Sequence, residues 1–212
     1  MRLITKICGG ENTYVYFNEE TKNGFVVDPG CTNGEDLNYI ISQIESNGIN
    51  VKFIFLTHGH FDHITGIAAL REKYGVPVAA YAGEAPLLAD PELNLSRMFL
   101  KEDVTVKVDY PLLEGLLPEK LTEGIAKLSL IHTPGHTAGC ACLYDEADGI
   151  LFSGDTLFFE TIGRTDLPTS DERAIIKSIK EKLLVLPEET VVYSGHGQHT
   201  TIAHEKSNAI YN

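Results

Sequence analysis

The chain carries the run Leu56-Thr57-His58-Gly59-His60-Phe61-Asp62-His63-Ile64-Thr65-Gly66, in which three imidazoles and a carboxylate fall within six positions, 58–63. The residues before it, 51–56, are apolar and rich in β-branched and aromatic side chains, which predicts a buried strand. Residues 67–74 have helical composition and are followed by Gly75. The polar run is therefore predicted to be a loop that joins a strand to a helix.

This concentration of polar side chains indicates a metal site. Burying such groups costs several kcal/mol each unless they are hydrogen-bonded or coordinated, and neutral imidazole and carboxylate are ordinary metal ligands. In an extended loop His58 and His60 project to the same side. Asp62 and His63 can then face a second point nearby. The alternative is a polar helix-capping turn, which a lone His or Asp would suggest.

Residues 57–63, Thr-His-Gly-His-Phe-Asp-His, resemble the T-H-x-H-x-D-H signature of the metallo-β-lactamase superfamily. Three more candidate ligands follow predicted strands, have glycine close by and occur in that family's order: His136, Asp155 and His196. The resemblance covers nearly the whole chain. It implies one domain over residues 1–212, folded as an α/β protein of the four-layer αββα sandwich type. Hydrophobic periodicity alone predicts only an α/β fold.

By the same resemblance, the site is a dinuclear metal centre. His58, His60 and His136 would hold the first ion, Asp62, His63 and His196 the second, and Asp155 would bridge both. The expected ions are two divalent metals, zinc first and iron or manganese as alternatives. A hydroxide shared between the ions would attack the substrate, oriented by the catalytic carboxylates of Asp62 and Asp155.

Two further residues, Asp28 and Arg164, each have two possible roles. Asp28 ends a predicted strand, and the resemblance implies that it supports the metal ligands from behind; the alternative is a turn-forming Asp before Pro29. The segment 161–168, Thr-Ile-Gly-Arg-Thr-Asp-Leu-Pro, resembles the loop that follows the bridging aspartate in glyoxalase II-like proteins. Arg164 would bind a substrate carboxylate there. Its alternative is a surface salt bridge to Asp166 or Asp171.

The implied reaction is hydrolysis of a thioester of the S-2-hydroxyacylglutathione type. Longer glyoxalase II enzymes bind glutathione partly through a C-terminal extension, and this chain ends soon after His196, so the resemblance is to the short bacterial subgroup. Persulfide dioxygenases share the run Gly-Arg-Thr-Asp and bind one iron through residues matching His58, His136 and Asp155. Lactone hydrolysis and a non-enzymatic binding module also stay open. Asp155 argues against a true β-lactamase.

The composition of the chain limits the kinds of molecule that it is expected to bind. The chain has 212 residues, of which 43% are hydrophobic, and a formal net charge of −13, which argues against nucleic acid and anionic membranes. No apolar run approaches the ~20 residues that span a bilayer. The four cysteines lack the spacing of a structural zinc site: Cys8, Cys31, Cys140 and Cys142. We expect a cytoplasmic, reducing location and a small-molecule thioester substrate. Oligomeric state is left open.

Further elements follow from periodicity and turn residues. Strands are predicted at 3–8, 13–18, 25–27, 77–81, 102–108, 124–131, 140–144, 150–152 and 191–193, and helices at 35–46 and at 171–184 with Ser170 as N-cap. Residues 84–100 are predicted to form short helical pieces without an assigned function, and residues 110–120 a loop. His132 is expected to pack locally, and His199 and His204 to be solvated.

Overall fold

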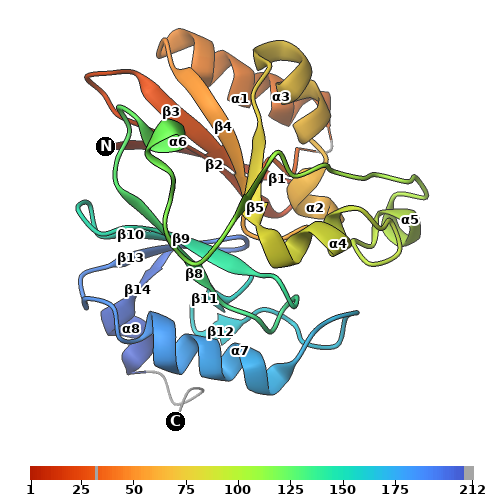
Figure 1. Ribbon diagram of the computed structural model, residues 1–212, viewed down its shortest axis with the longest axis vertical. Coiled ribbons are helices and arrows are strands. Elements are labelled where there is room, and N and C mark those ends of the chain that lie inside the picture. Colours follow the sequence, from red (N-terminus) through yellow and green to blue (C-terminus); the bar gives the residue numbers. More distant parts are fainter. Residues whose placement is uncertain (32, 208–212) are drawn as a thin grey trace.

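Two six-stranded sheets face each other in this computed structural model, which describes residues 1–31 and 33–207 (Figure 1). The first sheet has the order β1-β2-β3-β4-β5-β6, with strands Arg2–Cys8, Glu11–Phe17, Asn23–Val27, Asn50–Leu56, Val78–Tyr81 and Tyr110–Leu112. The second has the order β14-β13-β10-β9-β8-β7, with strands Thr200–Thr201, Val191–Ser194, Ile150–Gly154, Ala141–Asp145, Leu128–His132 and Gly115–Leu116. A small hairpin joins β11 (Leu157–Phe158) to β12 (Thr161–Ile162).

Helices cover the outer faces of both sheets. On the first sheet lie α1 (Gly34–Ser46) and α3 (Ile67–Tyr74), and on the second lie α7 (Glu172–Ser178), its π-helical continuation η2 (Ile179–Leu183) and α8 (Ile202–Lys206) (Figure 1). Short helices occupy the connections: α2 (Phe61–Ile64), η1 (Ala82–Glu84), α4 (Ala85–Leu88), α5 (Ser96–Phe99) and α6 (Glu119–Thr122). The predicted four-layer αββα sandwich is confirmed.

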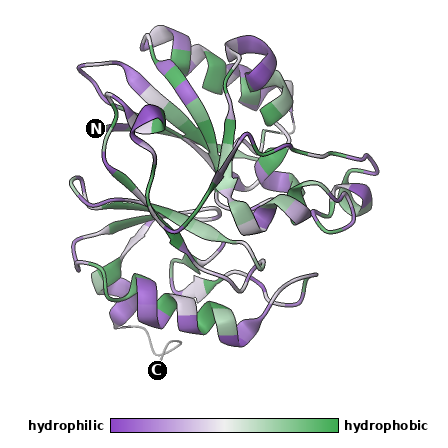
Figure 2. Ribbon diagram, in the orientation of Figure 1, coloured by the Kyte–Doolittle hydropathy of each residue, from purple (hydrophilic) through white to green (hydrophobic). Residues whose placement is uncertain are grey.

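Strand β4 shows why the sheets are buried on both faces. Phe53 and Phe55 point into the core between the sheets, whereas Ile54 and Leu56 point into the core under α1 and α3. Because successive side chains alternate between faces, a strand covered on both sides is apolar throughout. Figure 2 shows this apolar colouring on the strands and mixed colouring on the outer helices. The Phe25 ring stacks on Phe53 at 4.8 Å and meets Phe152 of the opposite sheet at 6.2 Å.

The direction of the strands places several loops at one edge. Strands β3, β4 and β5 are parallel neighbours, and so are β10 and β13. Strand β8 runs in the same direction as β10, because both are antiparallel to β9. The carboxyl ends of parallel strands lie at the same edge of a sheet, where ligands bind in open α/β sheets. The loops that follow β4, β8, β10 and β13 carry the predicted metal ligands.

Most predicted elements are confirmed, but the predictions for residues 102–120 are wrong. Residues 102–108 form no strand, although Val106 is buried and its N–H donates to Leu88 O at 2.9 Å. The predicted loop at 110–120 holds β6, β7 and the start of α6. Strand β6 contains Pro111, which an edge strand tolerates because one side of its backbone needs no partner. Its pairing with β5 depends on long-range contact that local periodicity does not report.

The helix predicted at 171–184 also differs at both ends. Asp171, not Ser170, caps it, since the Asp171 carboxylate accepts a hydrogen bond from Ala174 N–H at 3.0 Å. The Ser170 hydroxyl donates instead to His136 O at 2.7 Å. The α-helix ends at Ser178, and the chain continues as the π-helical turn η2. Ser170 therefore supports the loop that carries His136.

Candidate metal centre

The predicted ligands converge at the shared edge of the two sheets. His58, His60 and His136 form one group, and Asp62, His63 and His196 another; within each group the ligand atoms lie within 4.8 Å of one another. Asp155 lies between them. Its Oδ1 is 3.5 Å from His63 Nε2, and its Oδ2 is 3.5 Å from both His136 Nε2 and His196 Nε2. The carboxylate of Asp155 thus reaches imidazoles of both groups.

Hydrogen bonds behind the imidazoles determine which ring nitrogen faces the centre. His136 Nδ1–H donates to Arg164 O at 2.8 Å, and His196 Nδ1–H donates to Gly10 O at 2.9 Å. Carbonyl oxygens only accept, so these contacts hold the proton on Nδ1 and leave the Nε2 lone pair free for an ion. His60 presents Nδ1 instead, which lies 2.9 Å from His136 Nε2.

Unpaired buried atoms show that the site fits cations. His58 Nε2, His63 Nε2 and Asp155 Oδ1 are buried without a hydrogen-bond partner among the described residues. Most buried polar atoms in folded proteins have a partner, because leaving them unpaired is costly. A divalent ion supplies that partner, and a mixed imidazole and carboxylate set suits zinc, iron or manganese. The residues present therefore fit two neighbouring divalent ions.

The electrostatics of the two groups differ. Burial and the surrounding imidazoles lower the pKa of His58 far below its usual range, and burial lowers the pKa of His60 to about 3. Both rings are therefore neutral at pH 7, as metal ligands must be. Burial opposes the charged form of His63 as well, but the carboxylates of Asp155 and Asp62 outweigh it and raise the pKa of His63. A cation suits the space between these carboxylates.

Asp28 lies behind the ligands, at the carboxyl end of β3. Its carboxylate accepts hydrogen bonds from Thr57 N–H at 2.8 Å and Thr57 Oγ–H at 2.6 Å, and lies 3.1 Å from His63 Nδ1. The backbone of Asp28 is left-handed, with φ of 45°, a conformation that costs a non-glycine residue about 1–3 kcal/mol. The contacts to Thr57 and His63 place the Asp28 carboxylate behind the His63 ring, and support of the metal ligands by Asp28 stays a prediction.

Glycine is required beside the ligands. A Cβ atom at Gly195 would overlap Asp155 Oδ1 and the His63 ring, and one at Gly163 would overlap the Asp155 carbonyl oxygen. These glycines let the backbone approach the centre where any side chain would displace a ligand.

Arg164 lines the cavity next to the metal ligands, but its guanidinium has a partner. Its Nε and Nη2 donate to the carboxylate oxygens of Asp166 at 2.7 and 2.8 Å, and both side chains are exposed. This is the salt bridge that the sequence analysis gave as the alternative. Binding of a substrate carboxylate by Arg164 stays a prediction.

Glu84 is a supporting residue that sequence reasoning missed. It is 1% exposed, and its carboxylate accepts hydrogen bonds from Gly59 N–H at 2.9 Å and Thr137 Oγ–H at 2.9 Å. It thereby ties the loop of His58 and His60 to the loop of His136. The available signal was its position just after β5, a parallel neighbour of β4. Burial raises the pKa of Glu84 to about 7.

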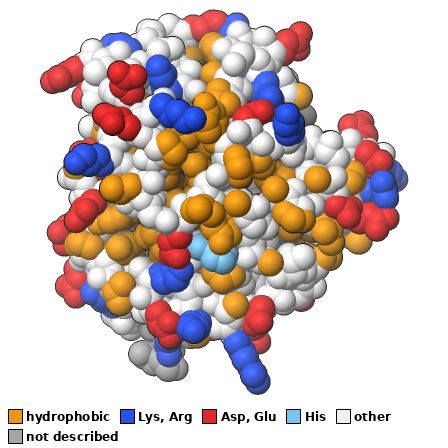
Figure 3. Space-filling model, in the orientation of Figure 1, with side chains coloured by type: hydrophobic (Ala, Val, Ile, Leu, Met, Phe, Trp, Pro, Cys, Tyr) orange, Lys and Arg blue, Asp and Glu red, His pale blue; other side chains and the backbone are white. Residues whose placement is uncertain are grey.

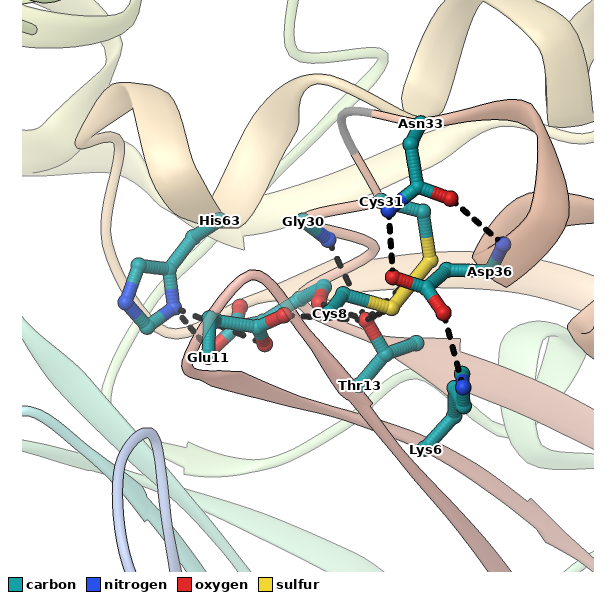
Figure 4. Close-up of a disulfide and its surroundings, with 10 residues drawn as sticks. Lys6, Cys8, Glu11, Thr13, Gly30, Cys31, Asn33, Asp36 and His63 are labelled. Carbon is teal, nitrogen blue, oxygen red and sulfur yellow. Dashed lines mark hydrogen bonds and ion pairs between the residues drawn. A yellow bond between two sulfur atoms is a disulfide. The ribbon is translucent and has the colours of Figure 1, made fainter.

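A disulfide beneath the site was also missed (Figure 4). Cys8 is joined to Cys31, and Thr13 Oγ1 lies 3.5 and 3.7 Å from the two sulfur atoms and 3.0 Å from Glu11 Oε2. Glu11 Oε1 in turn lies 4.0 Å from His63 Nδ1, and burial raises the pKa of Glu11 well above its usual range. Disulfides persist in oxidising compartments, so this pair does not support the expected reducing location.

The remaining cysteines and histidines contribute little to the centre. Cys140 and Cys142 are buried and free. His132 stacks on Tyr81 at 4.1 Å, as local packing predicted, and the exposed His204 pairs with Glu160 at 2.9 Å. The described helices include none with the length and apolar character needed to cross a bilayer.

Two facing sheets whose common edge carries paired groups of His and Asp side chains define a class of metal-binding proteins. Residues 8–196 match the family described as the metallo-beta-lactamase superfamily, and this chain belongs to it. The family resemblance seen in the sequence is confirmed. The Bacillus subtilis protein called probable metallo-hydrolase YqgX is 39% identical over 191 residues, which cover 90% of this chain and 88% of that protein. This protein is therefore a metallo-hydrolase of that superfamily.

Three other proteins bear on substrate and metal. The Haemophilus influenzae protein called hydroxyacylglutathione hydrolase GloC is 34% identical over 196 residues, covering 89% of this chain and 86% of that one. The structure of a protein called BLEG-1 B3 metallo-beta-lactamase is 36% identical, with a TM-score of 0.89 and full coverage of both chains. A structure of TTHA1623 in a di-iron-bound form is 30% identical, with a TM-score of 0.79 and 98% coverage of each chain.

Proposed function

We propose that this protein is a dinuclear metal-dependent hydrolase that cleaves thioesters of the S-2-hydroxyacylglutathione type, acting as a single domain on a small-molecule substrate. The observation that carries the proposal is the position of Asp155 between two groups of ligands, with its carboxylate oxygens facing imidazoles of both. The GloC relative supports the thioester, and the di-iron form of TTHA1623 leaves iron beside zinc and manganese as the metal.

The cavity over the ligands supports a small substrate. It has a volume of about 450 Å³, within the range of ~300–1,000 Å³ usual for small-molecule sites. Bound divalent ions would supply a water of lowered pKa and polarise the substrate carbonyl. Asp62 faces this cavity with a side chain 33% exposed, and lies 3.4 Å from His196 Nε2. We assign Asp62 and Asp155 to holding and orienting the attacking water.

The lining of the cavity favours a thioester over a poorer leaving group. Among the described residues around it, the titratable side chains are predicted metal ligands and Arg164. Among these described lining residues, none is therefore a separate acid placed to protonate a departing group. A thiol has a pKa near ~8.5 and leaves as the thiolate without protonation, unlike an amine. This chemistry agrees with a thioester as the bond that is cleaved.

The test is metal analysis combined with a substrate panel. We expect about two divalent ions per chain and hydrolysis of S-lactoylglutathione, lost in His58→Ala and Asp155→Ala variants whose circular dichroism is unchanged. Full turnover in either variant would refute the assignment. One iron per chain with oxygen uptake on a persulfide would indicate the dioxygenase instead. A lactone and a β-lactam complete the panel, the latter because of the likeness to BLEG-1.

A further inference from the structure

Two apolar walls flank the cavity above the metal ligands. Phe61, Leu95 and Phe99 form the first wall, from α2 and the α5 region. The second is made by Phe158, Ile162 and Leu167, from the β11–β12 hairpin and the segment that follows it. Figure 1 shows α5 and the segment after β12 projecting on the same side of the molecule, one from each half.

Both walls are attached directly to the centre. Phe61 precedes Asp62 in the chain, and its ring stacks on Phe99 with centroids 5.0 Å apart. On the opposite wall the Phe158 ring lies 6.0 Å from the His196 ring. A substrate whose reacting carbonyl lies at the ligands therefore extends between these walls.

Away from the metal ligands, the cavity offers few cationic groups to an anionic substrate portion. Apart from the imidazoles, Arg164 is the basic side chain among the described residues that line it, and both of its donor groups facing Asp166 are occupied. The formal net charge of the chain is −13. Figure 3 shows a different face, in front of β5 and β8, where apolar side chains gather between scattered charged ones. A glutathione moiety, with its carboxylates, finds little cationic complement in the cavity.

We propose that the two walls bind the hydrocarbon chain of an acyl group, so that the substrates are thioesters of apolar, medium-length acids. This proposal rests on thioester hydrolysis as the function, and it assigns the site an apolar acyl thioester in place of an S-2-hydroxyacylglutathione. The acyl chain lies between Phe99 and Ile162, and its carbonyl carbon lies at the ligands. Water attacks that carbon, the carbon–sulfur bond breaks, and the products are the free acid and the thiol.

The experiment measures kcat/KM of the metal-loaded protein for acetyl, butanoyl, hexanoyl and octanoyl thioesters of one small neutral thiol, with S-lactoylglutathione for comparison. Burial of each added methylene predicts a rise of about three- to fourfold until the cavity is full. Phe99→Ala and Ile162→Ala, from opposite walls, should each lower the ratio of hexanoyl to acetyl kcat/KM by about tenfold. Met98→Ala is the matched control, since Met98 is 70% exposed, adjoins Phe99 and does not line the cavity.

Three outcomes separate the two proposals. The apolar substrate class is supported if kcat/KM rises with acyl chain length and if the ratio of hexanoyl to acetyl kcat/KM falls in both wall variants. Equal kcat/KM along the series, or a preference for S-lactoylglutathione, overturns that class while thioester hydrolysis stands. Absence of hydrolysis of every thioester by the metal-loaded protein overturns both.

Discussion

Replacing Asp28 by Asn tests whether the Asp28 carboxylate determines which ring nitrogen of His63 carries the proton. In the structure Asp28 Oδ1 accepts from Thr57 N–H at 2.8 Å, while Oδ2 lies 3.1 Å from His63 Nδ1. Asn has nearly the same shape but only one acceptor oxygen. If that oxygen keeps the bond to Thr57 N–H, the NH₂ group faces His63 Nδ1. His63 then accepts on Nδ1 and carries its proton on Nε2, the atom that faces Asp155 at 3.5 Å.

The expected cost falls mainly on one ion. A protonated Nε2 cannot act as a ligand, and loss of such supporting hydrogen bonds lowers metal affinity by roughly 10–100-fold, equivalent to about 1.4–2.7 kcal/mol. His63 belongs to the group with Asp62 and His196, although Asp155 reaches both ligand groups and His63 also lies with Asp28 and His58. We therefore expect the ion at the Asp62, His63 and His196 group to lose more affinity than the other ion.

The assay is titration of metal-free protein with zinc in competition with a chromophoric chelator. The wild type should fit two tight sites, and Asp28→Asn one tight site and one weakened site. Asp103→Asn is the control, because Asp103 is exposed and its pair with Arg97 is a surface salt bridge of small energetic value. Wild-type affinity at both sites in Asp28→Asn would refute the proposed role of Asp28.

Three more predictions follow from buried or paired side chains. Glu84→Ala leaves the Gly59 N–H unpaired and frees the Thr137 hydroxyl to bond only to Cys140 Sγ, so chelator competition should show about tenfold weaker binding at the His58 group. Glu72→Ala, on the exposed face of α3, is the control. Glu11 has a raised pKa, so above about pH 4.5 the folded metal-free protein holds a proton that the unfolded chain has lost. The free energy of unfolding of the wild type should therefore fall as pH rises. Urea unfolding of Glu11→Gln should show a smaller fall, and a pH dependence identical to that of the wild type would contradict this. Arg164→Ala should raise KM for a carboxylate-bearing thioester more than it lowers kcat if Arg164 leaves Asp166 to bind substrate. An unchanged KM would show that wild-type Arg164 stays paired with Asp166 and does not bind the substrate carboxylate.

The sequence predicted the sandwich and the candidate ligands because these signals are local. The apolar run of residues 51–56 follows from burial on both faces of β4, and the ligands of residues 58–63 lie within a single loop. His136, Asp155 and His196 each lie within four residues of the end of a strand, so the family order of motifs could be read along the chain. Prediction from local sequence patterns failed at residues 102–120, where short elements depend on pairing with distant strands.

Tertiary structure alone decided the partners of side chains far apart in the chain. Four cysteines allow three pairings into two bonds, and sequence cannot choose among them; the fold brings Cys8 and Cys31 to a Cα–Cα distance of 4.8 Å and leaves the other two free. Glu84 became a support for the centre only because β5 lies beside β4. Sequence determined which residues are chemically able to bind metal, because ligand chemistry belongs to the side chain. Which of them meet, and what holds them, depends on strand order and register, since these place distant loops at one edge.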